Sequence, residues 1–323
     1  MDVGTFCAQS RVLIVAGKGG VGKTTMSAAL ARMASRTGRS VLIVELEGKS
    51  GITGAFGLDH DLGYDEAELQ PARPPDQGPV RARRITPDDA LVEYLEDHGL
   101  RRVSKRLVSS GVVDVVSTAI PGIRDVLVLG KIKQLEREEV ADLIVVDAPA
   151  TGHAITFLTS ASGLVNAARG GPLRSQASDV VELLADPTRC RVLLVTLPED
   201  MPVSETIESA FTLEDKAGVQ LGPVIVNATD PVPKGLERSA QEVAAGLEVD
   251  ASLLAALEAA RRFRLERHAI SAAQIERLAR DLPLPQLLVP TVPAETIGVA
   301  ETDLLATALA SAIGQLVPEV PAT

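Results

Sequence analysis

The chain has 323 residues, 46% of them apolar, and a formal net charge of −11. This apolar content is enough for a sizeable core, and the acidic balance disfavours nonspecific binding to nucleic acid or anionic lipid. Aromatic residues make up 2% of the chain, so base-stacking platforms are not expected. The cysteines, Cys7 and Cys190, form no CxxC pair, which favours a reducing compartment. No apolar run reaches the length of a membrane span and residues 1–10 lack the features of a signal peptide, so we expect a cytoplasmic protein without stable membrane insertion.

Short apolar runs rich in Val, Ile and Leu recur along the chain, with longer helical stretches between them. Continuous apolarity is typical of strands that are buried on both faces. Strands that alternate with helices form right-handed crossovers, so the sequence predicts an α/β fold with a mostly parallel sheet covered by helices on both faces. The expected strands are residues 11–15, 41–44, 143–146, 192–195, 224–226 and 287–289, with a further short strand at 80–85.

The strongest motif lies directly after the first expected strand and before a helix expected at 26–36. It consists of Gly17, Lys18, Gly19, Gly20, Val21, Gly22, Lys23, Thr24 and Thr25, and it satisfies the P-loop pattern. Glycines let successive backbone N–H groups turn toward one anion, and the positive end of the following helix points to the same place. Lys23 supplies a cation for the outer phosphates, and the Thr24 hydroxyl is a ligand for Mg²⁺. The motif predicts a P-loop NTPase rather than an ordinary glycine-rich turn.

Lys18 is a second lysine within this motif. Its position resembles the deviant Walker A signature of partitioning ATPases, nitrogenase iron protein, septum-site ATPases and the arsenite-pump family. The resemblance implies that ATP and Mg²⁺ are the cofactors. It also implies that Lys18 reaches across a dimer to the partner's nucleotide and neutralises charge that grows on the phosphates during transfer. The alternative is a solvated lysine on a loop, which a monomeric protein would favour.

Two regions of helical spacing interrupt the series of strands. Residues 88–140 predict a helical insertion, or subdomain, and residues 236–281 predict C-terminal helices. Residues 70–79 are rich in Pro, which predicts a surface loop. Apolar residues within 103–135 form either a small groove for a client or part of the protein's own core, and we favour the second interpretation. There is no internal repeat, so we expect a single P-loop ATPase domain over residues 1–323.

The strand at 143–146 is followed by Asp147, which brings a carboxylate to the carboxyl edge of the sheet. We expect Asp147 to hold Mg²⁺ through its water shell; a capping Asp at the end of a core strand is the alternative. The segment reads Asp147, Ala148, Pro149, Ala150, Thr151, Gly152 and His153. It resembles switch II of the arsenite-pump and tail-anchored-protein targeting ATPases, the ArsA/GET3 family. The resemblance implies that the backbone at Gly152 approaches the γ-phosphate and that His153 relays its presence, although a lone His is more often a helix-start residue.

The resemblance continues toward the end of the chain. Asn227 follows the strand at 224–226 and matches the asparagine that reads adenine in relatives, because an amide both donates and accepts. A turn-forming Asn is the alternative. Residues 293–298 resemble the late loop that covers adenine, with Pro293 and Glu295 as the residues expected there.

Switch I of the family carries an aspartate that positions the attacking water, and Glu47 occupies that place in this chain. A longer side chain displaces the carboxylate, and a misplacement of ~1 Å can slow a reaction about a hundredfold. Glu45 could take the role instead, or both glutamates could merely flank a loop. The residues expected to carry the catalysis are Lys18, Lys23, Glu47 and Asp147.

We therefore expect an ATPase whose dimer, made of identical or paralogous chains, closes on ATP and acts on a protein client or a membrane partner. The alternative is a slowly hydrolysing regulatory switch or scaffold, motivated by Glu47. A DNA- or membrane-positioning ATPase is disfavoured, because residues 301–316 contain no Lys or Arg for a basic amphipathic helix. Arsenite transport is disfavoured as well, because the chain lacks a cysteine cluster.

Overall fold

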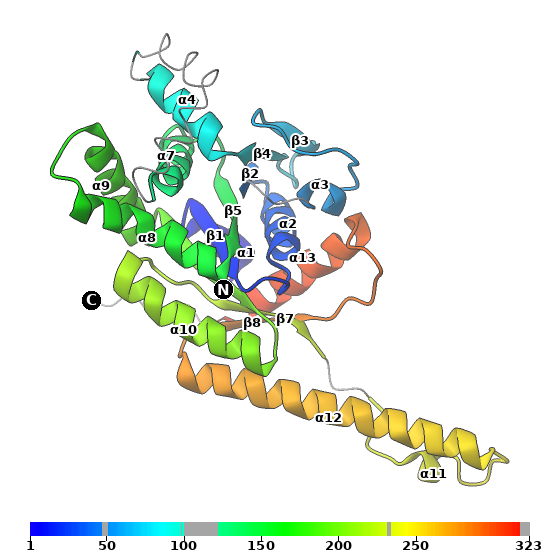
Figure 1. The fold of residues 1–323 in the computed structure, drawn as a ribbon. Coiled ribbons are helices and arrows are strands. Elements are labelled where there is room, and N and C mark those ends of the chain that lie inside the picture. Colours follow the sequence, from blue (N-terminus) through cyan, green and yellow to red (C-terminus); the bar gives the residue numbers. More distant parts are fainter. Residues whose placement is uncertain (47–50, 98, 100–121, 231–233, 317–323) are drawn as a thin grey trace.

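The computed structural model describes residues 1–46, 51–97, 99, 122–230 and 234–316, and a central 8-stranded sheet organises them (Figure 1). The strand order is β3-β4-β2-β5-β1-β6-β7-β8, and neighbours are parallel except for β3 with β4. The strands are β1 (Val12–Gly17), β2 (Val41–Leu46), β3 (Ala67–Gln70), β4 (Val80–Ile85), β5 (Leu143–Ala150), β6 (Cys190–Thr196), β7 (Val224–Thr229) and β8 (Gln286–Pro290).

The predicted fold class is confirmed, since every expected strand overlaps an observed one and the sheet is mostly parallel. The edge strand β3 was not expected, and Gln70, placed at the start of a loop by its neighbouring prolines, is its last residue. This strand is short and lacks β-branched residues, so neither its composition nor its length indicated a strand.

The described helices are α1 (Val3–Ala8), α2 (Lys23–Ser35), α3 (Ile52–Ala55), α4 (Pro87–Asp97), α7 (Ile123–Arg137), α8 (Thr151–Ala167), α9 (Pro172–Ala185), α10 (Asp200–Ala217), α11 (Ala240–Val243), α12 (Ala251–Asp281) and α13 (Val299–Gly314). Helix α7 lies within the region 88–140 that was expected to be helical and α4 begins one residue before it, while α11 and α12 lie within 236–281. Much of the candidate groove at 103–135 lies outside the described residues.

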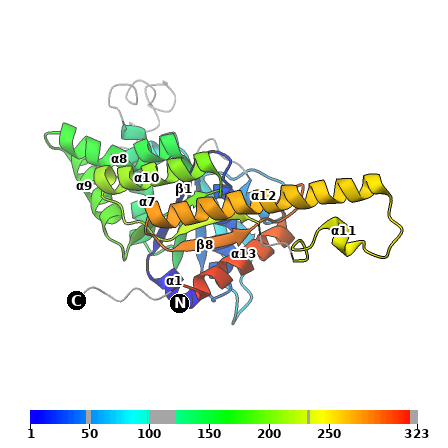
Figure 2. The ribbon, with the colours of Figure 1, turned by 90° about the horizontal axis from the view of Figure 1, so that it is seen from below.

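Alternation along each strand divides the core between the two faces of the sheet. In β1, Val12 and Ile14 belong to the cluster formed with α7, α8, α9 and α10. Leu13 and Val15 point to the other face and belong to the cluster formed with α1, α2, α3 and α13 (Figures 1 and 2). Both sides of β1 are therefore buried, which explains its unbroken apolar sequence.

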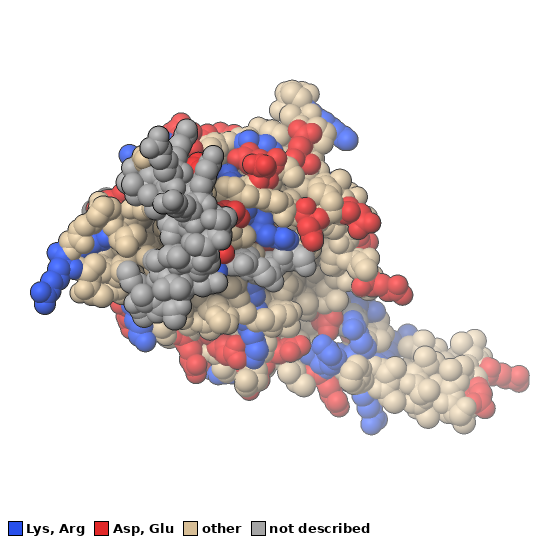
Figure 3. Space-filling view, turned by 45° about the horizontal axis from the view of Figure 1, so that its top comes forward, with Lys and Arg blue, Asp and Glu red and all other residues tan. Residues whose placement is uncertain are grey.

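Helix α12 extends beyond the body of the molecule together with α11 (Figures 1 and 2). Its C-terminal part is attached to α10, where Leu278 is buried and Arg277 pairs with Asp200 at 2.8 Å. Farther out, the side chains of Leu253 and Leu257 are exposed. On the face shown in Figure 3, charges of both signs are mixed, and the outer part of this extension is mostly uncharged with acidic side chains at its tip. None of the described helices is long and apolar enough to cross a bilayer.

Candidate active site

The loop that follows β1 is pressed against the ends of two other strands. Gly17 has φ +152° and Gly22 has φ +91°, and a Cβ atom at these positions would lie 2.2 Å from the Val195 carbonyl oxygen and 2.5 Å from Asn227 Nδ2, respectively. Only glycine satisfies both the backbone conformation and the close approach. At Gly20, by contrast, a Cβ would meet no atom of the described residues within 4 Å. The loop therefore packs against β6 at Gly17 and against β7 at Gly22, while Gly20 is exposed, an arrangement that suits a phosphate-binding loop.

Lys23 begins α2 and is buried, with its Nζ donating a hydrogen bond to the Lys18 carbonyl oxygen at 2.8 Å. Its ammonium group is therefore held inside the loop, beside the positive end of the helix. Val21 is buried in the core, so only its backbone faces the loop. Gly19 is exposed and Thr25 is half-buried.

Thr24 and Asp147 meet in front of this loop. The Thr24 hydroxyl donates to Asp147 Oδ2 at 2.7 Å, although the residues are 123 positions apart in the sequence. Asp147 is fully buried in β5, paired in register with Val15 of β1 and Glu45 of β2. A hydroxyl and a carboxylate are hard oxygen donors, so their chemistry suits Mg²⁺.

Glu45 is a second buried carboxylate at the same edge, and Arg84 of β4 holds it. The Arg84 Nε and Nη2 atoms donate to Glu45 Oε1 at 2.9 and 2.7 Å. Burial raises the pKa of Glu45, while the hydrogen bonds and charge of Arg84 oppose the rise and the charge of Asp147 adds to it. Glu47, the residue expected at the switch I position, lies outside the described residues.

Lys18 forms an ion pair within its own chain. Its Nζ lies 2.6 Å from Glu205 Oε1 on α10, and both side chains keep about a third of their surface exposed. The sequence did not predict the contact with Glu205, because residue spacing within a helix does not indicate which side chain 187 positions away it will bind.

Asn227 contacts the P-loop directly. Its Nδ2 donates to the Val21 carbonyl oxygen at 2.9 Å, and its Oδ1 accepts from the Ala228 backbone N–H at 2.8 Å. Asn227 therefore supports the loop, and among the described residues these two bonds leave one of its amide hydrogens for a ligand. Pro293 and Glu295 are exposed in the loop between β8 and α13.

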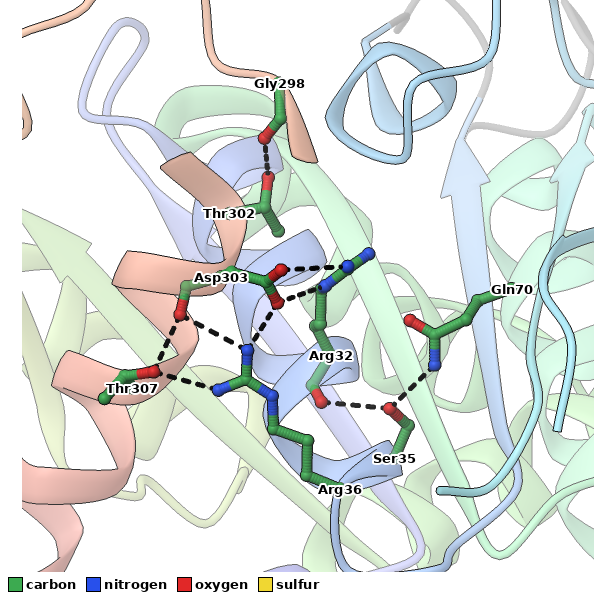
Figure 4. Close-up of polar contacts among 8 residues, drawn as sticks. All are labelled: Arg32, Ser35, Arg36, Gln70, Gly298, Thr302, Asp303 and Thr307. Atoms are coloured by element: carbon green, nitrogen blue, oxygen red, sulfur yellow. Dashed lines mark hydrogen bonds and ion pairs between the residues drawn. The ribbon is translucent and has the colours of Figure 1, made fainter. Parts of the chain in front are cut away.

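A network of ionic hydrogen bonds joins the P-loop helix α2 to α13, which follows the Pro293–Glu295 loop (Figure 4). Arg32 donates from Nε and Nη2 to the two carboxylate oxygens of Asp303 at 2.5 and 3.0 Å, and Arg36 donates to Asp303 and to Thr307 Oγ1. Burial alone raises the pKa of Asp303, but the two guanidinium groups outweigh it and hold the pKa below its usual range. Sequence patterns did not identify this clamp.

The segment expected to be switch II runs from β5 into α8. Gly152 and His153 are both exposed at the start of this helix. His153 lines a hollow of about 380 Å³ together with Arg124 and Asp125 at the start of α7. Burial raises the pKa of Asp125, opposed by the charges of Arg124 and His153. The segment that follows Asp147 therefore faces the helices of the 88–140 region.

A parallel sheet with a glycine loop between β1 and α2 and an acidic residue on the neighbouring strand defines a P-loop NTPase. Residues 10–168 match the family model described as anion-transporting ATPase. ATPase BagA of Mycobacterium tuberculosis is 40% identical over 250 residues, which cover 75% of this chain and 71% of BagA.

More distant relatives include a putative arsenical pump-driving ATPase of Halobacterium salinarum, 24% identical over 70% of this chain and 37% of the relative. ATPase get3 of Schizosaccharomyces japonicus is 30% identical over 52% of each chain. The chain belongs to the ArsA/GET3 family of ATPases, and its activity is the hydrolysis of ATP.

Proposed function

We propose that this protein is a Mg²⁺-dependent ATPase whose dimer closes on ATP and passes that change to a protein client or a membrane partner. The observation that carries the proposal is the hydrogen bond between Thr24 and Asp147 beside the buried Lys23. This hydrogen bond joins the two oxygen donors that we expect to hold Mg²⁺, and Lys23, which we expect to contact the phosphates, is the residue before Thr24.

Each group has a role that follows from its chemistry. The backbone N–H groups of the loop, at Gly19, Gly20 and their neighbours, bind the phosphates, and the Lys23 ammonium neutralises the outer ones. The Thr24 hydroxyl and, through water, the Asp147 carboxylate hold Mg²⁺. When bound, Mg²⁺ polarises the phosphate oxygens and withdraws charge from them.

The remaining roles rest on the family resemblance. Asn227 reads the adenine while the loop with Pro293 and Glu295 covers it. Gly152 approaches the γ-phosphate. Glu47, or Glu45 in its place, orients the attacking water.

In the dimer, Lys18 reaches the nucleotide of the other subunit, which is either an identical chain or a paralogue. This contact makes turnover depend on association, because charge that grows on the phosphates is neutralised from outside the subunit. The glutamate at the switch I position supports a second candidate, a switch or scaffold that binds ATP tightly and hydrolyses it slowly.

Turnover and mass should be measured together over a series of protein concentrations with saturating Mg·ATP. We expect turnover per subunit to rise with dimer formation, and Lys23→Ala and Lys18→Ala to reduce it by ~100-fold or more, as for the loss of one preorganised charge-stabilising group. Lys216→Ala, which alters an exposed lysine on α10, is the control. A protein that stays monomeric and whose turnover is unchanged by Lys18→Ala would contradict the dimeric proposal. Tight ATP binding without turnover would support the second candidate, the switch or scaffold.

A further inference from the structure

The ion pair between Lys18 and Glu205 occupies the one side chain of the P-loop that the proposed dimer needs elsewhere. Its atoms Nζ and Oε1 lie 2.6 Å apart, with 32% of the Lys18 side chain and 35% of the Glu205 side chain exposed. At this distance the charged groups are in direct contact, and no space for water separates them. Glu205 therefore competes with any other anion that Lys18 could bind.

Glu205 also faces the segment expected to act as switch II. It lines a hollow of about 350 Å³ between α10 and the start of α8, together with Gly152, Ile155 and Glu208. Glu205 thus contacts the P-loop through Lys18 and shares a hollow with Gly152, the residue whose backbone we expect near the γ-phosphate. A movement of this segment upon ATP binding would therefore change the surroundings of the ion pair.

We propose that Glu205 is a latch for Lys18. It holds the lysine inside its own subunit while the subunits are apart, and it releases the lysine to the partner's nucleotide when the dimer closes. The proposal rests on the dimeric function proposed above. Glu205 is a positioning residue, because it acts through Lys18 and contacts neither substrate nor reacting atoms.

The exposure of the pair determines how strong the latch is. An ion pair between partly exposed side chains changes an equilibrium by up to about fivefold. A latch of this strength does not block closure; it raises the protein or ATP concentration at which closure occurs. It also weakens with ionic strength, because the exposed pair is screened.

The test compares Glu205→Gln with Glu208→Gln. Both substitutions remove one negative charge from α10 beside the same hollow, but Glu205 is the one bound to Lys18. Turnover is measured against protein concentration with saturating Mg·ATP, and dimer content is measured by sedimentation. We expect Glu205→Gln to lower the concentration of half-maximal turnover by up to about fivefold for each subunit that carries it, without changing the turnover of the fully formed dimer. Glu208→Gln should leave the curve in place.

Further measurements distinguish the latch from a merely structural effect of Glu205 and test it independently of the dimer proposal. The shift caused by Glu205→Gln should shrink in high salt, and Glu205→Gln should have no effect when Lys18→Ala is already present. If Lys18→Ala lowers turnover but Glu205→Gln leaves the half-maximal concentration unchanged or raises it, the latch is wrong and the dimer proposal stands. If Lys18→Ala changes neither turnover nor association, both are wrong.

Discussion

Thr24 Oγ1 donates to Asp147 Oδ2 at 2.7 Å, so the first turn of α2 and the carboxyl edge of β5 are joined by a hydrogen bond at the mouth of the P-loop. The contact links two sequence motifs, and its partners are oxygen atoms that suit the same hard cation.

Thr24→Val keeps the shape of the side chain and removes the hydroxyl. We expect kcat with Mg·ATP to fall by ~100-fold or more, since a preorganised group at the phosphates is lost. Titrating Mg²⁺ at fixed ATP checks this, and Asp147→Asn should behave similarly. Thr212→Val, which removes a hydroxyl bonded to a helix carbonyl in α10, is the matched control. Turnover within a few-fold of the wild type would exclude Thr24 as a metal ligand.

Arg84→Met leaves the carboxylate of Glu45 buried without its guanidinium partner. We expect the free energy of unfolding at pH 7.5 to fall by about 3 kcal/mol, as when one partner of a buried ion pair is removed. Burial raises the pKa of Glu45 and Arg84 opposes the rise, so the substitution raises the pKa further.

A carboxyl group with a raised folded-state pKa favours the folded protein below its unfolded pKa of about 4.5 and loses this contribution as the pH rises through the folded value. The loss caused by Arg84→Met should therefore be smaller at pH 5.5 than at pH 7.5. Urea unfolding at both values checks this, and adding Glu45→Gln should restore part of the stability. A loss that does not depend on pH would show that packing, not charge, dominates.

Asp303→Asn weakens the clamp between α2 and α13. Because Asp303 is partly exposed, we expect a loss of only about 1 kcal/mol at pH 7. The pKa of Asp303 is below its usual range, so its contribution is present above the unfolded pKa of about 3.8 and disappears as the pH falls through the lower folded value. If α13 positions the loop that covers adenine, KM for ATP should rise while kcat changes little. An unchanged KM would show that the contact between α2 and α13 does not affect nucleotide binding.

The thiols should be inert in the folded protein. Burial raises the pKa of Cys7 to about 11 and that of Cys190 to about 12, so the reactive thiolate is scarce at pH 8. A disulfide reagent such as Ellman's should label neither cysteine until urea unfolds the chain, and arsenite should leave turnover unchanged. Rapid labelling of the native protein would contradict the buried positions of these side chains.

The central strands could be predicted because both faces of the sheet are covered, which gives them continuous apolar runs such as residues 12–16 in β1, 41–44 in β2 and 143–146 in β5. The short edge strand β3 escaped prediction because its composition is mixed and only part of it is buried. For residues 236–281, spacing predicted helices, and the structure has α11 and α12 there; the spacing did not indicate where one ends and the other begins.

For the site, the glycine spacing and the strand before Asp147 indicated two segments that the structure brings together. Contacts between charged side chains could not be predicted. Glu205, Arg84 and Asp303 lie on regular elements where a charged residue is usually solvated, and their partners are fixed by the tertiary fold. Local periodicity contains no information about such pairs.

Because the strands are parallel, the two ends of the sheet also differ in how well they should tolerate an attached group. Every residue that we assign to nucleotide chemistry lies in the carboxyl-terminal half of a strand or after it, whereas the turn around Asp186 and Thr188 precedes β6 at the opposite end. A fluorescent label or an affinity tag attached at that turn should therefore report on the protein during turnover without entering the cradle.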